Sequence, residues 1–160
     1  MIRITKQADY GIVLVTHFVS EPGSLICTAR DLSEGARLPL PMVGKILKTL
    51  VRKGLLVSHR GVKGGYSLAR PAGEISMSDI VSALDGPIAM TSCSAHPGDC
   101  EIESDCPAVG NWHRINIAIQ NALQGISLLE MSRPSNALRA AAALHGAPGP
   151  ALDAARLEIA

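Results

Sequence analysis

The stretch between Pro41 and Gly54 has two chemically different sides, and this division constrains the fold more than any other feature of the chain. Its apolar residues recur at steps of three and four, which predicts a helix with one buried side: Val43, Ile46, Leu47 and Leu50. The basic residues fall on the opposite side: Lys45, Lys48 and Arg52. Burying the apolar side therefore turns three positive charges outward. Gly54 marks the end of the helix, because glycine tolerates the left-handed conformation that terminates helices.

Two further helices are predicted before this one. Apolar residues at helical spacing run from Thr5 to about Ser20, and Glu21-Pro22-Gly23 ends the pattern. Thr28-Ala29-Arg30-Asp31 reads as a capping box, in which a hydroxyl and a carboxylate satisfy early backbone donors. It opens a short helix, which we expect Gly35 to close.

A hairpin is predicted after the third helix. Leu55 to Arg60 and Tyr66 to Ala69 are strand-like, and they are joined by Gly61-Val62-Lys63-Gly64-Gly65, whose glycines permit positive φ angles. Three helices followed by a glycine-tipped hairpin predict a winged helix-turn-helix, whose last helix enters the major groove of DNA. The expected fold class is mainly α with a small β-hairpin.

The charge distribution favours a polyanion as the partner of this region. Residues 1–86 carry eleven Lys or Arg against seven Asp or Glu, and the stretch from Lys45 to Lys63 holds six basic residues and no acidic one. The alternative is an ordinary solvated face. The start of a helix also favours a phosphate. The candidate contacts with double-stranded DNA are Thr28, Lys45, Lys48, Arg52, Arg60 and Lys63.

The C-terminal half is organised around one long helix. Ser76-Met77-Ser78-Asp79 is another capping box, and Gly86-Pro87 ends the helix that it opens. From about Pro107 to Ile126 a longer helix carries a seam that suits pairing with an identical helix: Trp112, Ile115, Ile119, Ala122 and Ile126. Burial against its own domain is the alternative, and we favour a homodimer. The expected organisation is a DNA-binding domain at 1–86, a cysteine loop and dimerisation helix at 87–132, and a flexible Ala-, Gly- and Pro-rich tail at 133–160.

Three of the four cysteines lie within fourteen residues: Cys93, Cys100 and Cys106. Thiolates bind zinc, copper(I) and iron-sulfur clusters, and the spacing leaves the metal open. The loop also holds four carboxylates and no Lys or Arg, so a bound cation would offset the charge of three thiolates. A disulfide switch is the weaker alternative, because sensor cysteines prefer electropositive surroundings. Cys27 stands apart and is predicted to be a small buried hydrophobe.

Several classes of protein are disfavoured by what the sequence lacks. The longest apolar stretch, Tyr10 to Val19, is shorter than the roughly 20 residues of a membrane helix. The N-terminus lacks the pattern of a signal peptide, so we expect a cytoplasmic protein. A nucleophile elbow, a phosphate loop and a dinucleotide fingerprint are all missing, which argues against an enzyme.

Taken together, these segments resemble the bacterial winged-helix regulators of the IscR and NsrR type, which sense iron-sulfur status or nitric oxide. The resemblance runs from about Met1 to Ser132. It rests on the octapeptide from Ile4 to Gly11, on Leu55 through Gly64-Gly65-Tyr66-Ser67-Leu68, and on the three cysteines followed by Trp112. Within the family the sequence is similar to regulators of the SUF cluster-assembly system. The resemblance implies a repressor of assembly genes, controlled by a two-iron or four-iron cluster at a dimer interface.

The same resemblance implies that the three cysteines ligate the cluster, and it leaves the fourth ligand open. Val109 stands where some relatives have a histidine. Asp9 matches an acidic residue that reaches the cluster from the partner subunit in nitric-oxide-sensing relatives. We place it ahead of His113, and both ahead of His96 or a loop carboxylate. Gly44 replaces a glutamate that governs the choice between operator classes in IscR-type relatives, so their operator sequence does not transfer.

Overall fold

The computed structural model describes residues 4–19, 26–61 and 64–133. Val62 and Lys63 at the predicted hairpin tip, and the predicted tail from residue 134 onward, lie outside these ranges. The helices and strands of the described part are α1 (Lys6–Thr16), α2 (Ala29–Ala36), α3 (Leu40–Arg52), β1 (Leu56–His59), β2 (Gly65–Leu68), η1 (Ala72–Glu74), α4 (Met77–Asp85), α5 (Ser92–Ala95), η2 (Glu103–Asp105), α6 (Val109–Gln124) and α7 (Leu128–Met131).

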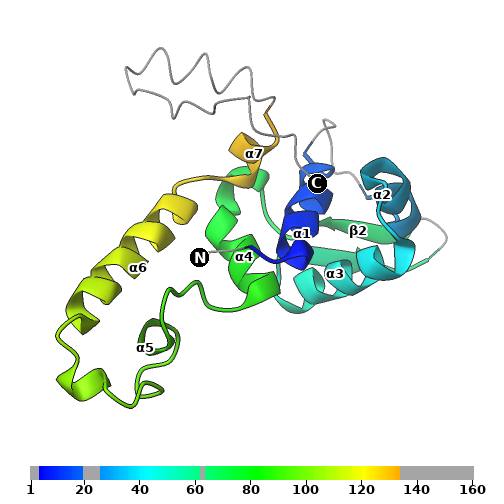
Figure 1. Cartoon of the computed structure of the whole chain (residues 1–160). Coiled ribbons are helices and arrows are strands. Elements are labelled where there is room, and N and C mark those ends of the chain that lie inside the picture. Colours follow the sequence, from blue (N-terminus) through cyan, green and yellow to red (C-terminus); the bar gives the residue numbers. More distant parts are fainter. Residues whose placement is uncertain (1–3, 20–25, 62–63, 134–160) are drawn as a thin grey trace, which may run out of the picture.

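The described part is mainly helical with one antiparallel pair of strands, which confirms the predicted fold class (Figure 1). α2, α3 and the hairpin lie on one side of the α1–α4 unit. α5 and α6 extend from its other side. The surface predicted to read DNA and the cysteine loop are therefore held at opposite ends of one protomer, with α1 and α4 between them.

The core forms where α1, α3 and α4 pack together. Its fully buried side chains include Leu14 of α1, Ile46 and Leu50 of α3, and Ile80 of α4. Burying a side chain of this size stabilises the fold by about 1.5–3 kcal/mol. The apolar stripe that predicted α3 is buried throughout, so its basic side faces outward.

Two predicted capping boxes are present, and one predicted helix end is wrong. Thr28 caps α2 with Asp31, and Ser76 caps α4 with Asp79. Gly35 lies inside α2, which continues to Ala36 and ends at Arg37 in the left-handed conformation, with φ 54°. Hydrogen bonds between Leu38 and Ser33 help to hold this turn: the Leu38 amide donates to the Ser33 carbonyl (3.0 Å), and the Ser33 hydroxyl donates to the Leu38 carbonyl (2.6 Å).

The hairpin has the predicted position, and Cys27 pairs with its second strand through a single β-bridge. β1 and β2 pair with Leu56 opposite Leu68 and Ser58 opposite Tyr66. Cys27 forms an isolated bridge with Tyr66, with amide-to-carbonyl distances of 3.0 and 2.8 Å. Cys27 also packs against the core, which agrees with its predicted apolar role, although it is only partly buried.

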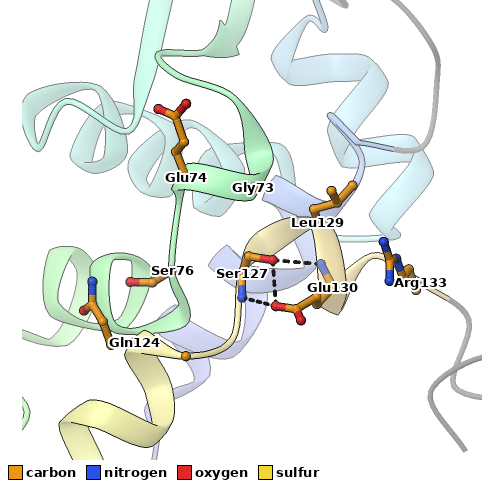
Figure 2. Close-up of a pocket in the computed structure, with 9 residues that line it drawn as sticks. Gly73, Glu74, Ser76, Gln124, Ser127, Leu129, Glu130 and Arg133 are labelled. Carbon is orange, nitrogen blue, oxygen red and sulfur yellow. Dashed lines mark hydrogen bonds between the residues drawn. The ribbon is translucent and has the colours of Figure 1, made fainter. Parts of the chain in front are cut away.

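α7, the short helix that follows α6 in the chain, was not predicted. Ser127 and Glu130 form a capping box at its start, drawn as dashed lines in Figure 2. Leu128 is fully buried, and its amide donates to the Ile75 carbonyl at 2.7 Å. This contact ties the chain after α6 to the segment that leads into α4. No helix in the described ranges is long and apolar enough to cross a membrane.

Candidate nucleic-acid interface and cysteine centre

A groove of about 500 Å³ separates α3 from the hairpin. Seven residues line it: Lys45, Lys48, Thr49, Val51, Arg52, Ser58 and Tyr66. Three of them are the basic residues that the sequence predicted on α3, so the structure brings this part of the candidate set together. Because α3 contains no acidic residue, its own side chains leave the positive charge uncompensated.

Arg52 is held in place by its own helix. Its guanidinium donates to the Thr49 hydroxyl at 3.2 Å, and that hydroxyl donates to the Lys45 carbonyl at 3.1 Å. Lys45, Lys48 and Arg52 are all exposed. An exposed arginine with a fixed position loses less side-chain entropy when it pairs with a phosphate.

Ser58 and Tyr66 are members of the groove that the sequence analysis missed. Ser58 of β1 and Tyr66 of β2 lie opposite each other in the hairpin. Ser58 is two residues after the buried Leu56, so both side chains lie on the face of the hairpin that is turned toward α3. The two-residue alternation of β1 could have revealed Ser58. Tyr66 required the register of the hairpin.

The remaining candidate DNA contacts stand outside the groove. Thr28 is exposed, but its amide and hydroxyl both donate to the Asp31 carboxylate, at 3.0 and 2.7 Å. A phosphate at this helix start would share those donors with Asp31. Arg60 is exposed just beyond β1, whereas Lys63 lies outside the described ranges. His59 pairs with the Ser67 hydroxyl at 2.8 Å across the hairpin.

The three loop cysteines sit in different environments. Cys93 is buried in α5, whereas Cys100 and Cys106 are partly buried, and none of the chain's four cysteines forms a disulfide. The Thr91 hydroxyl lies 3.1 Å from Cys93 Sγ and donates to the Ser94 hydroxyl at 3.0 Å. That arrangement leaves the Cys93 thiol as the donor toward Thr91. The Gly98 amide donates to the Glu103 carboxylate at 2.8 Å and closes the turn between Cys93 and Cys106.

Within one protomer these thiols are not gathered into a metal site. No group of three or more His, Cys, Asp or Glu side chains in the described ranges is placed to hold a metal ion. Asp9 is exposed in the first turn of α1, and His113 is partly buried on α6. Val109, at the position of the missing histidine, is the first residue of α6.

Asn116 is the one buried residue of α6, and its Oδ1 has no hydrogen-bond partner among the described residues. One turn later, the Gln120 amide donates to the Ile88 carbonyl at 3.1 Å, so this side of α6 faces the segment between α4 and α5. α6 also packs against α5, which carries Cys93. A polar group without a partner therefore lies on the side of α6 that faces the chain leading to Cys93.

A second hollow, of about 490 Å³, lies at the junction of η1, α6 and α7 (Figure 2). Its polar groups include Ser76 and Ser127, which begin α4 and α7. The Asp79 and Glu130 carboxylates of the two capping boxes already accept hydrogen bonds from the Ser76 and Ser127 amides, at 3.0 and 2.8 Å. These helix starts are therefore already neutralised, and the groove along α3 is the better candidate for a polyanion.

Known proteins match nearly the whole described chain. The Rrf2 family, described as iron-dependent transcriptional regulators, matches residues 4–134. The HTH-type transcriptional regulator IscR of Cronobacter sakazakii is 26% identical over 130 residues, which cover 81% of this chain and 80% of that protein. The oxidised form of Staphylococcus aureus CymR is 28% identical, with a TM-score of 0.62 over 83% of this chain and 98% of that one. CymR of B. subtilis, described as a global cysteine regulator, shares the fold at 23% identity and a TM-score of 0.65, over 82% of this chain and 97% of that one.

Proposed function

The chain belongs to the Rrf2 family of transcriptional regulators, and from this premise we propose that a bound iron-sulfur cluster controls its binding to a DNA operator. As a member of that family it is a DNA-binding regulator and not an enzyme. The proposal adds three elements to that: the cluster, its ligands Cys93, Cys100 and Cys106, and a homodimer that completes the site. A regulator that acts on DNA belongs in the cytoplasm, which is the location we propose.

One observation carries the DNA-binding side of the proposal. The groove along α3 gathers Lys45, Lys48 and Arg52 beside the hairpin. Exposed cations along a recognition helix suit the phosphates that flank a major groove. Thr28, Arg60 and Lys63 complete the proposed set of contacts.

The chemistry of the cysteine loop supports a cluster, and a partner subunit would supply its fourth ligand. Three thiols without disulfides lie in a loop whose carboxylates Asp99, Glu101 and Asp105 are exposed. When bound, a cluster supplies a centre whose charge and integrity respond to oxidants, nitric oxide or iron supply. Cys93 would hold it from α5, and Cys100 and Cys106 from the loop. Asp9 of the partner subunit is the proposed fourth ligand, with His113 as the alternative.

The proposed homodimer rests on the predicted seam of α6. Ile115 and Ile126 are 44% and 40% exposed, Ala122 is exposed, and Trp112 and Ile119 are only partly buried. None of the five seam residues is buried in the core of its own protomer. A second copy would cover this apolar surface. The proposed role of Asp9 further requires that α1 of one subunit approach the loop of the other in such a dimer.

The resemblance to SUF-associated regulators supports a finer proposal, that the operator controls iron-sulfur cluster assembly genes and that the protein represses them. A cluster-loaded regulator that represses cluster synthesis would form a negative feedback loop. Its repression would be relieved when clusters are scarce.

A loop stabilised by zinc or by a disulfide is the competing function. It rests on the same three thiols, which are free in the protomer, because thiolates also bind zinc and two of the three could form a disulfide. In that case the protein would be a thiol redox switch or would use the loop only as a structural module.

Metal analysis combined with DNA binding separates these proposals. The protein is purified without oxygen, and iron, acid-labile sulfide, zinc and visible absorbance are measured. We expect a coloured protein with iron and sulfide, and an affinity for operator DNA that differs between the loaded protein and the apoprotein. Stoichiometric zinc without visible absorbance would contradict the cluster and favour the alternative.

Two cysteine variants sharpen the experiment. Cys100→Ala removes a proposed ligand, so it should lose iron and bind DNA as the apoprotein does. Cys27→Ala is the matched control, because Cys27 bridges to the hairpin and lies outside the loop. Equal iron loss in both variants would contradict the assignment of the loop cysteines as ligands.

A further inference from the structure

The start of α3 is chemically unusual for a helix that reads DNA. From Leu38 to Gly44 no side chain can donate a hydrogen bond to a base. Leu40 and Met42 are nevertheless 43% and 38% exposed, and Pro41 between them is also exposed. The first turn of α3 therefore offers an apolar surface.

The position of this surface determines which part of DNA it would meet. In a helix-turn-helix, residues at the N-terminal end of the recognition helix approach the base edges, and the phosphates are contacted from its flanks. The three basic residues of α3 begin at Lys45, after the apolar turn. A duplex held by Lys45, Lys48 and Arg52 would thus place Leu40 and Met42 against the floor of the major groove.

Only one base offers an apolar group there. Thymine carries a C5 methyl in the major groove, whereas the other bases present hydrogen-bonding groups that Leu40 and Met42 cannot satisfy. We propose that Leu40 and Met42 read the operator through thymine methyl groups, so that each half-site requires thymine at the position that each residue contacts. This inference rests on the proposed DNA-binding role of α3.

Gly44 removes a possible obstacle to this approach. A Cβ built at Gly44 meets no atom within 4 Å, so the side of α3 next to the apolar turn is open. A base pair can come close to the helix backbone at this point. The neighbouring cations also favour nucleic acid over an apolar protein partner as the occupant, because a protein docking on Leu40 and Met42 would have to neutralise or desolvate Lys45 and Lys48.

Removing single methyl groups from the DNA tests the inference. A duplex is selected by the wild-type protein from a random library, and each thymine of a half-site is then replaced in turn by deoxyuridine, which lacks only the C5 methyl. Affinity is measured by fluorescence anisotropy at one fixed salt concentration. At one or two positions we expect binding to weaken roughly fourfold, the effect of losing one buried methyl.

Protein variants then assign the effect to residues. Leu40→Ala or Met42→Ala should bind the thymine and deoxyuridine duplexes equally at its own position, because the methyl has lost its apolar partner. Val13→Ala is the matched control, since Val13 is 40% exposed on α1, and it should keep the full effect of the methyl. Lys48→Ala should weaken both duplexes by the same factor, because a phosphate contact is blind to the base.

The outcomes distinguish this inference from the function on which it rests. If the wild-type protein selects and binds a duplex but tolerates deoxyuridine at every position, the methyl readout is wrong while DNA binding stands. The inference also fails if both alanine variants keep the methyl effect. A wild-type protein that enriches no duplex would instead overturn the proposed function. Circular dichroism of the exposed-site variants confirms that they are folded.

Discussion

The carboxylate of Asp85, at the end of α4, accepts hydrogen bonds from both the amide and the hydroxyl of Thr5, the N-cap of α1. The Thr5 amide donates to Asp85 Oδ2 at 3.0 Å, and the Thr5 hydroxyl donates to Asp85 Oδ1. The same hydroxyl accepts from the Ala8 amide at 3.2 Å, so it caps α1 while it binds α4. Gly86, with φ 89°, follows directly and leads the chain toward the cysteine loop. The start of the helix that carries Asp9 is thereby fixed to the root of that loop.

Breaking this connection should cost stability despite its exposure. Asp85→Ala removes both acceptors, and we expect the free energy of unfolding to fall by about 1 kcal/mol, the net contribution of a typical intramolecular hydrogen bond, because the pair is exposed to solvent. Thr5→Ser is the control, because it keeps the hydroxyl and the amide. Urea denaturation measures both variants. Equal stability of Asp85→Ala and the wild type would mean that the bond contributes nothing in solution.

Two glycines in helix interiors should respond oppositely to the same substitution. At Gly44 an added Cβ meets nothing within 4 Å, so Gly44→Ala should raise the free energy of unfolding by about 0.5–1 kcal/mol through helix propensity. At Gly11, which is buried, the added Cβ would collide with Leu84 of α4. Gly11→Ala should therefore destabilise the fold. Thermal unfolding checks both, and a gain at Gly11 would show that Leu84 moves aside without loss.

The capping boxes predict how stability depends on pH. Hydrogen bonds from the Thr28 hydroxyl and then its amide lower the pKa of Asp31. The amide of Ser127 and then its hydroxyl lower the pKa of Glu130. Since the folded pKa is below the unfolded value, about 3.9 for Asp and 4.3 for Glu, the stabilisation is complete above those values and disappears as the pH falls through the lowered folded pKa.

Asp31→Asn isolates one of these contributions. The variant should be less stable than the wild type at neutral pH. The difference should begin to shrink below about pH 4, where the aspartate of the unfolded wild type binds a proton, and should vanish once the pH falls below the lowered pKa of folded Asp31. Melting temperatures between pH 2 and 7 give the comparison, with Glu101→Gln in the exposed part of the cysteine loop as the charge-matched control. A difference in melting temperature that stays constant with pH would mean that the ionisation of Asp31 does not contribute to stability.

The sequence predicted those parts of the fold that local chemistry decides. Thr28 with Asp31 and Ser76 with Asp79 are capping boxes whose partners lie three residues apart, and the stripe of α3 needs only helical periodicity. The wrong helix end at Gly35 has the opposite cause. Arg37 adopts the left-handed conformation because bonds with Ser33 hold the turn, and residue type alone gave no sign of them.

The missed features depend on contacts between distant segments. Ser127 and Glu130 have the spacing of a capping box, but α7 is four residues long and forms where Leu128 enters the core beside Ile75. Tyr66 joins the groove through the register of the hairpin. The candidate cysteine ligands could be chosen from the sequence, whereas their arrangement could not, because only two short helices, α5 and η2, give the loop regular structure.

Asn116 offers a test of whether the isolated protomer is the complete environment of α6. Its side chain is 6% exposed, and its Oδ1 accepts no hydrogen bond from any described residue. A buried acceptor without a partner costs about 1–3 kcal/mol. If that cost is real in the apoprotein, Asn116→Leu should raise the free energy of unfolding by about 1 kcal/mol in urea denaturation. Asn116→Asp, which places a charge in the same position, should lower it.

The same variant becomes informative when the protein is assembled. Should Asn116→Leu stabilise the apoprotein but weaken dimerisation or iron retention, measured by analytical ultracentrifugation and by iron content, the amide has its partner in the assembled state. Such a result would mean that the protomer retains an unpaired polar group that assembly later satisfies. A variant less stable than the wild type under every condition would instead mean that Oδ1 is already hydrogen-bonded in the protomer, for example by a buried water molecule.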